Sequence, residues 1–228
     1  MKEETIKRVE EETADWEYLK RLPAEISGFG LQKLMTIDGD TYKLFCYENT
    51  ATSRSITAYF HEETHEYKVL EAVGLIEFCR IEFITGSIEI FTELLSRHLT
   101  GLLQSLAVFD KKTLGSIVLS QGILEWEYGR NLPGELEGFS LFIAPTAPLP
   151  ITNGAYVIID YSDFAIESSL TIYYNLYRDD YWGEARIRRI PDVSYIFDAT
   201  DLKELEAKLE ANMVPRLKEI RRRAMEVA

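Results

Sequence analysis

Cysteine, histidine and long apolar runs are scarce in this sequence. Its 228 residues include only two cysteines, Cys46 and Cys79, each inside an aromatic or apolar run. Buried, reduced thiols fit this placement better than a disulfide framework does. No run of about 18 apolar residues exists, and the first residues lack the basic start and apolar core of a secretion signal. The sequence therefore predicts a cytoplasmic protein with no membrane partner.

Signatures of nucleotide binding and of nucleophilic catalysis are also missing. No G-x-S-x-G, G-x-x-x-x-G-K-S/T or G-x-G-x-x-G pattern occurs. The three histidines and two cysteines do not recur between the halves of the chain. A Cys–His or Ser–His arrangement would therefore depend on tertiary contacts that the sequence does not specify. We expect no cofactor, and an enzyme is the less favoured class of protein.

Positive charge is scarce relative to negative charge. Lys and Arg total 25 against 38 Asp and Glu, which gives a formal net charge of -13. The resulting field opposes contact with phosphates, so nucleic acid is not an expected partner. Residues 1–110 carry 11 basic and 20 acidic side chains, a net charge of -9, and residues 111–228 carry 14 and 18, a net charge of -4. The first half therefore has the more acidic surface.

An internal repeat is the clearest feature that the sequence does contain. The segment WEYLKRLPAEISGFGL at 16–31 recurs as WEYGRNLPGELEGFSL at 126–141, with nine identities in sixteen positions at an offset of 110. Beyond it the offset is 114, because the loop at 144–153 is four residues longer than its counterpart. This self-similarity predicts a tandem duplication, with one repeat at 1–110 and the other at 111–228.

Each copy is expected to hold an antiparallel meander of strands followed by a long helix. Runs such as YKLFCYE and YVIIDYS have the β-branched and aromatic composition of strands, and short turn-forming links join them. Expected strands include 29–36, 67–73 and 79–84 in the first copy and 139–144, 181–188 and 193–197 in the second. The predicted fold class is α+β: two tandem copies, each a sheet of about five strands with the helix packed on one face.

Apolar residues at helical spacing predict where these two long helices lie. Ser87 and Asp201 are good N-cap residues immediately before them, and Glu204 could complete a capping box with Asp201. Gly101 and Pro215 occupy equivalent positions inside the helices. Because both residue types weaken a helix interior, we expect a kink or break there in each copy.

Two further segments are expected to be helical. Residues 3–14 and 111–124 are predicted to form lead-in helices.

The last long helix carries a basic cluster, which we interpret as favourable charge near a helix C-terminus in contact with the acidic surface. The members of this cluster are Arg216, Lys218, Arg221, Arg222 and Arg223.

The stretch FHEETHEY at 60–67 formally matches the H-E-x-x-H zinc motif between His61 and His65. That motif needs both histidines on one face of a helix. The equivalent stretch in the second copy, NLYRDDY, lies between two strand-like runs, so we predict a hairpin tip in both places. A hairpin could still hold a metal through His61, His65 and a carboxylate such as Glu71. The solvated hairpin tip is the favoured interpretation, and we expect no metal.

Strand alternation indicates a binding face on the second sheet. If Leu170 and Ile172 face the helix, then Thr171 and its neighbours at every second position face away from it. The outward side chains combine Trp, Tyr and Arg, which dominate interface hot spots. The candidate binding residues are Tyr59 and His61 in the first copy and Tyr173, Asn175, Tyr177, Trp182, Arg186 and Arg188 in the second. In the alternative interpretation these aromatics cover the sheet or fill the seam between the copies.

A non-enzymatic, cytoplasmic binding or adaptor protein is the function that these features favour. Its acidic surface and aromatic sheet face would contact another protein, which could be a basic one, or a second copy of the chain. One alternative is a metal-dependent hydrolase that uses His61 and His65, with Glu62 as the base. The other alternative is a small-molecule binder with a pocket between helix and sheet.

Overall fold

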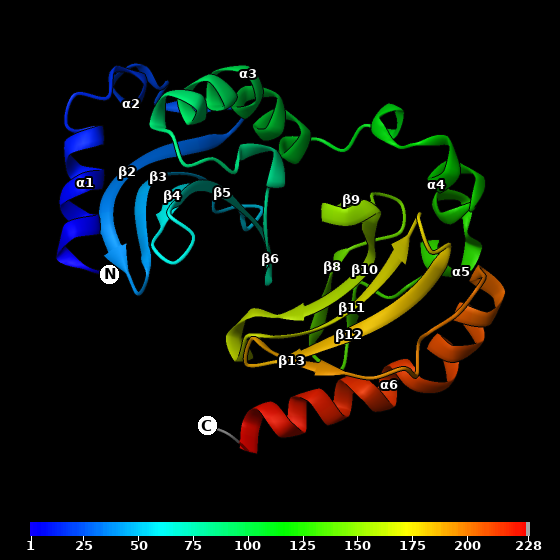
Figure 1. The fold of residues 1–228 in the computed structure, drawn as a ribbon. Coiled ribbons are helices and arrows are strands. Elements are labelled where there is room, and N and C mark those ends of the chain that lie inside the picture. Colours follow the sequence, from blue (N-terminus) through cyan, green and yellow to red (C-terminus); the bar gives the residue numbers. More distant parts are fainter. Residues whose placement is uncertain (227–228) are drawn as a thin grey trace. The chain divides into compact units, whose positions relative to one another are not determined.

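The chain forms two compact units, Met1–Phe109 and Asp110–Ala228, in a computed structural model that describes residues 1–226 (Figure 1). Each unit combines one antiparallel sheet with a long helix at its C-terminal end, so the fold is α+β with two sheet units. Within residues 1–226, no helix has the combination of length and apolar composition that a membrane crossing requires.

The first unit contains a six-stranded meander in which consecutive strands are neighbours. Its strands are β1 (Glu25–Ile26), β2 (Phe29–Asp38), β3 (Thr41–Asn49), β4 (Arg54–His61), β5 (Glu66–Val73) and β6 (Ile76–Cys79). The helices of this unit are α1 (Glu3–Thr13), α2 (Glu17–Arg21), the 3₁₀ helix η1 (Ile81–Phe83) and α3 (Ile88–Ala107). Short turns join β2 to β6, and such turns allow only antiparallel pairing of consecutive strands.

The second unit contains a seven-stranded sheet in the order β13-β12-β11-β10-β8-β7, with β9 paired to β10. Its strands are β7 (Glu135–Leu136), β8 (Phe139–Ile143), β9 (Leu149–Pro150), β10 (Ala155–Asp163), β11 (Ser168–Asn175), β12 (Asp180–Ile187) and β13 (Ile190–Val193). Its helical segments are η2 (Lys111–Thr113), α4 (Ser116–Ser120), η3 (Ile123–Glu125), α5 (Glu127–Arg130), η4 (Thr152–Gly154), η5 (Phe164–Ile166) and α6 (Leu202–Glu226).

Aromatic rings form the centre of the first unit's core. Tyr67 of β5 stacks on Phe91 of α3 with 5.4 Å between ring centroids, and Phe60 of β4 meets Tyr67 edge-on at 5.0 Å. Trp16 lies 6.4 Å from Phe91 and 6.2 Å from Phe45 of β3. All five rings are buried, and each such pair adds about 0.5–1.5 kcal/mol beyond its area burial. We call the side of the sheet that carries Tyr67 the core face.

The long helix α6 of the second unit contacts β11 and β12 (Figure 1). Its buried apolar residues recur at helical spacing and are Leu205, Leu209, Met213, Leu217, Ile220 and Ala224. The basic cluster of this helix meets acidic side chains, as the sequence predicts. Arg216 and Arg223 both pair with Asp192, at 2.5 and 2.6 Å, and Arg221 pairs with Asp163 at 2.6 Å.

Both predicted N-caps are formed. Ser87 Oγ accepts a hydrogen bond from the Ile90 N–H at 3.3 Å, and Asp201 Oδ1 accepts one from the Glu204 N–H at 2.8 Å. The Glu204 carboxylate in turn accepts from the Thr200 N–H at 2.9 Å. The reciprocal bond of the capping box is therefore made to the residue before the cap instead of to the cap itself.

Neither long helix is broken at the position where the sequence predicts a kink or break. The helix α3 runs through Gly101 and α6 runs through Pro215 without interruption. A glycine costs about 1 kcal/mol and a proline about 3 kcal/mol in a helix interior. The buried apolar stripe of each helix outweighs these local costs, because tertiary packing supplies most of a helix's stability.

Three other segments also differ from the sequence predictions. The predicted strand 79–84 is wrong, because β6 ends at Cys79 and the 3₁₀ helix η1 follows it with Phe83 buried. The predicted strand 193–197 is wrong as well, because β13 covers Ile190–Val193 and ends where that strand was to begin. Residues 111–124 do not form one lead-in helix but are divided among η2, α4 and the first part of η3. Local composition does not mark where such short helical turns and loops replace a regular element.

Candidate functional site

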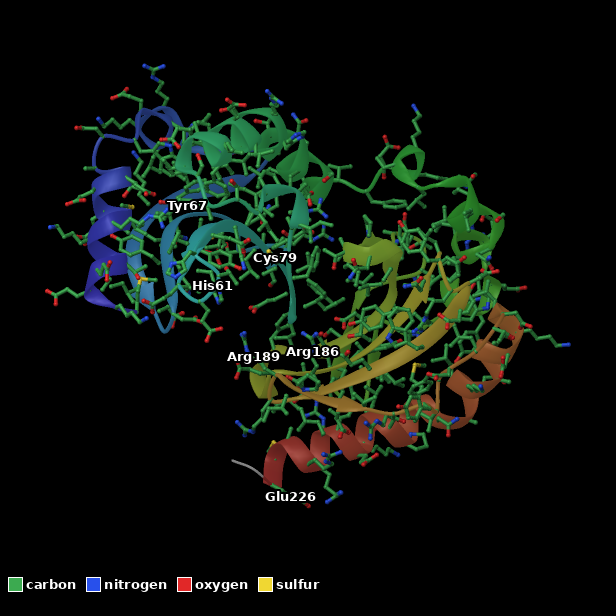
Figure 2. All side chains as sticks on the ribbon, in the orientation of Figure 1. His61, Tyr67, Cys79, Arg186, Arg189 and Glu226 are labelled. Carbon is green, nitrogen blue, oxygen red and sulfur yellow. The ribbon has the colours of Figure 1, made fainter. Side chains whose placement is uncertain are left out.

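Residues 60–67 form a hairpin, and His61 lies at its base (Figure 2). The strand β4 ends at His61 and β5 begins at Glu66, and these two residues pair across the hairpin. His65 lies in the turn with φ at 54°, and it is exposed. The two histidines therefore do not share the face of a helix, so the metalloprotease arrangement is not formed.

The His61 side chain meets residues of two turns. Its Nε2 lies 3.1 Å from Asp40 Oδ2, and its Nδ1 lies 3.1 Å from Thr64 Oγ1. Asp40, His61 and Glu63 each offer one ligand atom within 4.8 Å of the others, so these are the residues that could hold a divalent cation. Because both ring nitrogens already have protein partners, the geometry does not require an ion.

Glu62 of the same turn binds the N-terminal segment. Its carboxylate accepts hydrogen bonds from the Lys2 N–H at 2.6 Å and from Thr5 Oγ1 at 3.0 Å, and it lies 3.5 Å from the Met1 amino group. The bond from Lys2 is the main cause of a lowered pKa of Glu62. A carboxylate engaged in this way is poorly placed to act as a general base beside His61.

Glu71, the remaining metal-ligand candidate, lies away from the histidines on the core face of β5. It is 2% exposed, and its Oε2 lies 3.3 Å from Arg80 Nε. Burial raises the pKa of Glu71 to about 7, against the opposing influence of the positive charges of Arg80 and Arg54. Sequence reasoning missed this buried ion pair, although the alternation of β5 placed a glutamate at a core position.

A buried polar cluster lies on the other side of the second sheet, which we call the Asp160 face. Asp160 is fully buried and accepts hydrogen bonds from Ser162 Oγ and Thr171 Oγ1, both at 2.6 Å. Burial raises the pKa of Asp160, and these two bonds and the charge of Arg186 act in the opposite direction. The cluster satisfies both carboxylate oxygens, which is what a stable buried carboxylate needs.

Three predicted binding residues meet on the Asp160 face. Tyr173 of β11 stacks on Trp182 of β12 with 4.8 Å between centroids and 12° between planes. The Arg178 guanidinium lies 5.2 Å from the centroid of the Trp182 ring. Arg186, labelled in Figure 2, pairs with Glu184 at 2.9 Å. Tyr173 is only 4% exposed and contributes to packing, whereas Trp182 and Arg186 are half-buried.

Three other predicted binding residues lie near the ends of β11 and β12. Tyr177 is 77% exposed in the turn between these strands. Asn175 supports that turn, because its side-chain oxygen accepts from the Tyr177 N–H at 2.9 Å and the Arg178 N–H at 3.1 Å. Arg188 follows the last residue of β12 and donates from Nε to the Ala224 carbonyl of α6 at 2.8 Å. Asn175 and Tyr177 therefore share one turn, whereas Arg188 lies at the other end of β12.

Tyr59, the last predicted residue, lies on β4 in the first unit. A hydrogen bond links it to Cys79, and burial raises the pKa of both side chains. Cys46 and Cys79 are both free thiols. Raised thiol pKa values reduce the thiolate fraction, so neither cysteine has the environment of a reactive nucleophile.

An acidic groove lies in the first unit where α1, α2 and the start of α3 meet. Its volume is about 460 Å³. The residues that line it, and that define the acidic groove below, are Glu11, Glu12, Asp15, Trp16, Glu17, Ile88, Glu89 and Thr92. Sequence reasoning identified the acidic half of the chain but not this groove, because its walls come from segments far apart in the sequence.

The bottom of the acidic groove is apolar. Trp16 is 8% exposed, and its Nε1 donates a hydrogen bond to Thr92 Oγ1 at 2.8 Å, which connects the start of α2 to α3. Ile88, in the first turn of α3, is buried beside it. The five carboxylates of the groove therefore surround an apolar surface instead of a polar one.

Cations of the same unit pair with four of these five carboxylates. The pairs join Lys7 to Glu11 at 3.7 Å, Arg8 to Glu12 at 2.7 Å and Lys20 to Glu17 at 3.0 Å. Lys20 also lies 3.4 Å from Asp15, and Arg21 lies 3.5 Å from Glu17. Exposed pairs of this kind contribute little to stability, so a cation from a partner can compete with them. The bond from Lys20 lowers the pKa of Glu17, and the bond from Ser87 lowers the pKa of Glu89. Both carboxylates are therefore ionised at neutral pH.

Comparison with protein-family models, with curated proteins and with solved structures finds no match to this chain.

Proposed function

We propose that the chain is a non-enzymatic binding protein that holds a basic segment of another protein in the acidic groove. The observation that carries this proposal is the combination of five carboxylates with a bottom formed by Trp16 and Ile88. Lysine and arginine have an apolar stem and a cationic head, so the two parts of such a side chain match the bottom and the walls. A cation near the Trp16 ring would gain further from the ring quadrupole.

The charge of the surrounding surface supports the same kind of partner. The net charge of -9 over residues 1–110 attracts a basic segment from a distance and raises its association rate. Exposed charges are screened over about 10 Å at 0.1 M salt, so the affinity falls as salt is added. Trp182 and Arg186 on the Asp160 face are a second contact in this proposal, because they keep part of their surface accessible.

A tandem duplication of one α+β unit, with the long helix on the core face of each sheet, is the second part of the proposal. Support comes from bonds and turns at positions separated by 110 or 114 residues, which we call equivalent positions. Tyr47 donates to the Pro23 carbonyl at 2.6 Å, and Tyr161 donates to the Pro133 carbonyl at 2.6 Å. Left-handed backbone recurs at equivalent positions, which are Gly28 and Gly138, Ser53 and Glu167, and His65 and Asp179.

The experiment compares charge reversal in the groove with the same reversal at equivalent positions of the second unit. The groove variant is Asp15→Arg with Glu17→Arg, and the matched control is Glu125→Arg with Glu127→Arg. Each variant changes the formal net charge from -13 to -9, because two carboxylates become two cations. The probe is a short fluorescent peptide of alternating arginine and leucine, and its binding is measured by anisotropy at low and moderate salt.

We expect the peptide to bind the wild-type chain and the control variant, and to bind the groove variant about tenfold or more weakly. A tenfold loss corresponds to about 1.4 kcal/mol, which is modest for the reversal of two nearby charges. Equal losses in both variants would mean that the peptide responds only to net charge. Either that result or the absence of binding to the wild-type chain would overturn the proposal.

A further inference from the structure

A second hollow, of about 320 Å³, lies in the first unit between η1 and the C-terminal half of α3. We call it the Arg80 pocket, and its lining residues are Arg80, Glu82, Phe83, Arg97, His98, Gly101, Leu102 and Ser105. This volume is at the lower end of the range for small-molecule sites. The lining combines two guanidiniums with a phenyl ring and a leucine, so it offers charge for one end of a ligand and apolar contact for the other.

Arg80 lines this pocket, its guanidinium lies 6.0 Å from the centroid of the Phe78 ring, and its hydrogen-bond donors are unused among the described residues. Its Nε lies 3.3 Å from Glu71 Oε2 and 3.2 Å from Glu82 Oε1, but neither contact has the geometry of a hydrogen bond. Within residues 1–226, no hydrogen bond involves its two terminal nitrogens either. The side chain is 22% exposed. The planar fork of a guanidinium matches the oxygens of a carboxylate or a phosphate.

The opposite wall of the pocket is one face of α3. Arg97 makes a single weak pair, with Glu93 at 3.4 Å, and both side chains are at least 67% exposed. His98 meets Phe83 edge-on with 6.2 Å between ring centroids, which connects this wall to η1. Arg97 is therefore free to turn toward a ligand that Arg80 holds from the other side.

Gly101 lines the pocket and has open space beside it. A Cβ at this position would meet no other atom within 4 Å, so close packing does not explain the glycine. Glycine in a helix interior costs about 1 kcal/mol relative to alanine. The space beside Gly101 is part of the pocket, and a larger side chain there would fill it.

We propose that the Arg80 pocket binds a small organic anion whose carboxylate or phosphate group is held by Arg80 and Arg97. Phe83 and Leu102 contact the apolar part of the ligand. The Glu82 carboxylate repels the anion, and the Glu71 carboxylate, when it is ionised, offsets the positive charge of Arg80. This site is separate from the acidic groove and takes a ligand of the opposite charge.

Because the pKa of Glu71 is raised, the attraction between Glu71 and Arg80 is weaker near neutral pH than that of a fully ionised carboxylate. Glu71 faces Arg80, Glu82 and Arg54 of β4, and Arg54 donates to the Leu106 carbonyl at the end of α3. With a pKa of about 7, Glu71 is partly protonated at neutral pH. Protonation removes one of the two negative charges beside Arg80, so the anion binds more tightly as the pH falls through 7.

The test measures binding of two probes, phenyl phosphate and benzoate, to the full chain by isothermal titration calorimetry. The variants are Gly101→Leu, which fills the pocket with a better helix former, and Arg97→Met, which removes an exposed cation. Arg21→Met is the matched control, because Arg21 is also well exposed, at 80% against 70% for Arg97, and lies outside the pocket. Thermal unfolding confirms that each variant is folded.

We expect at least one probe to bind, with about tenfold weaker binding in both pocket variants and unchanged binding in the control. Preference for phenyl phosphate or for benzoate identifies the anionic group. The proposal is overturned if neither probe binds at millimolar concentration, or if folded Gly101→Leu and Arg97→Met proteins bind as well as the wild-type chain. Loss of binding in Arg21→Met to the same degree would show a non-specific charge effect and would also overturn it.

Discussion

The two units share their order of strands but bury their carboxylates on opposite sides of the sheet. The first unit buries Glu71 on the core face beside Arg80, where the equivalent position of the second unit holds Ala185. The second unit buries Asp160 on the other face, where the first unit holds Cys46. Backbone turns and tyrosine bonds therefore recur, whereas the charged interior is particular to each unit. The buried charged residues are therefore better indicators of function than the recurring backbone turns and tyrosine bonds are.

The tryptophans that precede α2 and α5 also have hydrogen-bond partners that differ between the two units. Trp16 donates to Thr92 on α3, and at the equivalent positions Trp126 donates to Glu206 on α6 at 2.8 Å. The indole N–H has a partner in both units, but only in the second is that partner a carboxylate. In the first unit the carboxylates of the groove lie at the surface, where a basic side chain can reach them.

The largest effect is expected from placing a carboxylate at the core position where the second unit has none. Ala185→Glu puts an acid beside Asp192, its cross-strand neighbour on β13, which Arg216 and Arg223 already engage. The positions equivalent to Arg54 and Arg80 hold Ser168 and Ser194. The new charge therefore meets a like charge and lacks the two arginines that flank Glu71. We expect a loss of about 3–5 kcal/mol in the free energy of unfolding at pH 8, the range for uncompensated buried charge. Urea unfolding measures this loss.

Ala185→Gln is the control for that change, because it adds the same volume without the charge. The difference between the Glu and Gln variants should shrink toward pH 5 as the new carboxyl takes up a proton. If Ala185→Glu were no less stable than Ala185→Gln at pH 8, the contrast between the two units would lose its electrostatic basis.

The backbone plan was predictable because it depends on features that recur along the chain. The repeat with its two offsets, the strand composition and the N-caps at Ser87 and Asp201 identified the sheets, the hairpin at 60–67 and the long helices. The buried clusters were not predictable in the same way. Alternation places Thr171 and Tyr173 on the side away from the helix, but it does not say that Asp160 lies beneath them or that both are buried. The acidic groove and the Arg80 pocket join segments whose contact only the tertiary fold determines.

The second prediction concerns the pH dependence that Glu71 gives to the first unit. Burial raises its pKa from the ordinary 4.5 to about 7 in the folded chain, so the folded state binds more protons than the unfolded state between these values. Stability contributed by the protonated carboxyl is present below pH 4.5 and is lost as the pH rises through 7. A shift of this size corresponds to about 3 kcal/mol at most.

Glu71→Gln should remove this part of the pH dependence, which urea unfolding at pH 5 and pH 8 would show. The variant should match the wild-type chain at pH 5 and be at least as stable at pH 8, because the desolvated charge is gone. Glu77→Gln serves as the control, since Glu77 is an exposed acid on the neighbouring strand β6. A strong loss of stability in Glu71→Gln at pH 8 would show that the ion pair with Arg80 outweighs desolvation.

The third prediction tests what the two units share. Tyr47→Phe and Tyr161→Phe each remove one hydrogen bond to a proline carbonyl with the same 2.6 Å length. We expect each substitution to cost about 1 kcal/mol and the double variant to cost the sum, because the sites are independent. Chemical denaturation of the three variants checks this. A large effect in one unit and none in the other would contradict the equivalence of the two bonds.

The smallest effect is expected at the hairpin, where the first unit has His61 and the second has Asn175. The bonds of His61 to Asp40 and Thr64 lie at the surface, and exposed interactions of this kind contribute little. We expect His61→Asn to change the free energy of unfolding by no more than about 0.5 kcal/mol. Zinc added to the wild-type chain should leave its thermal midpoint unchanged, as it should in the variant. A zinc-dependent rise in the wild-type midpoint that is absent in His61→Asn would instead establish Asp40, His61 and Glu63 as a metal site, because a ligand that binds only the folded state raises its stability.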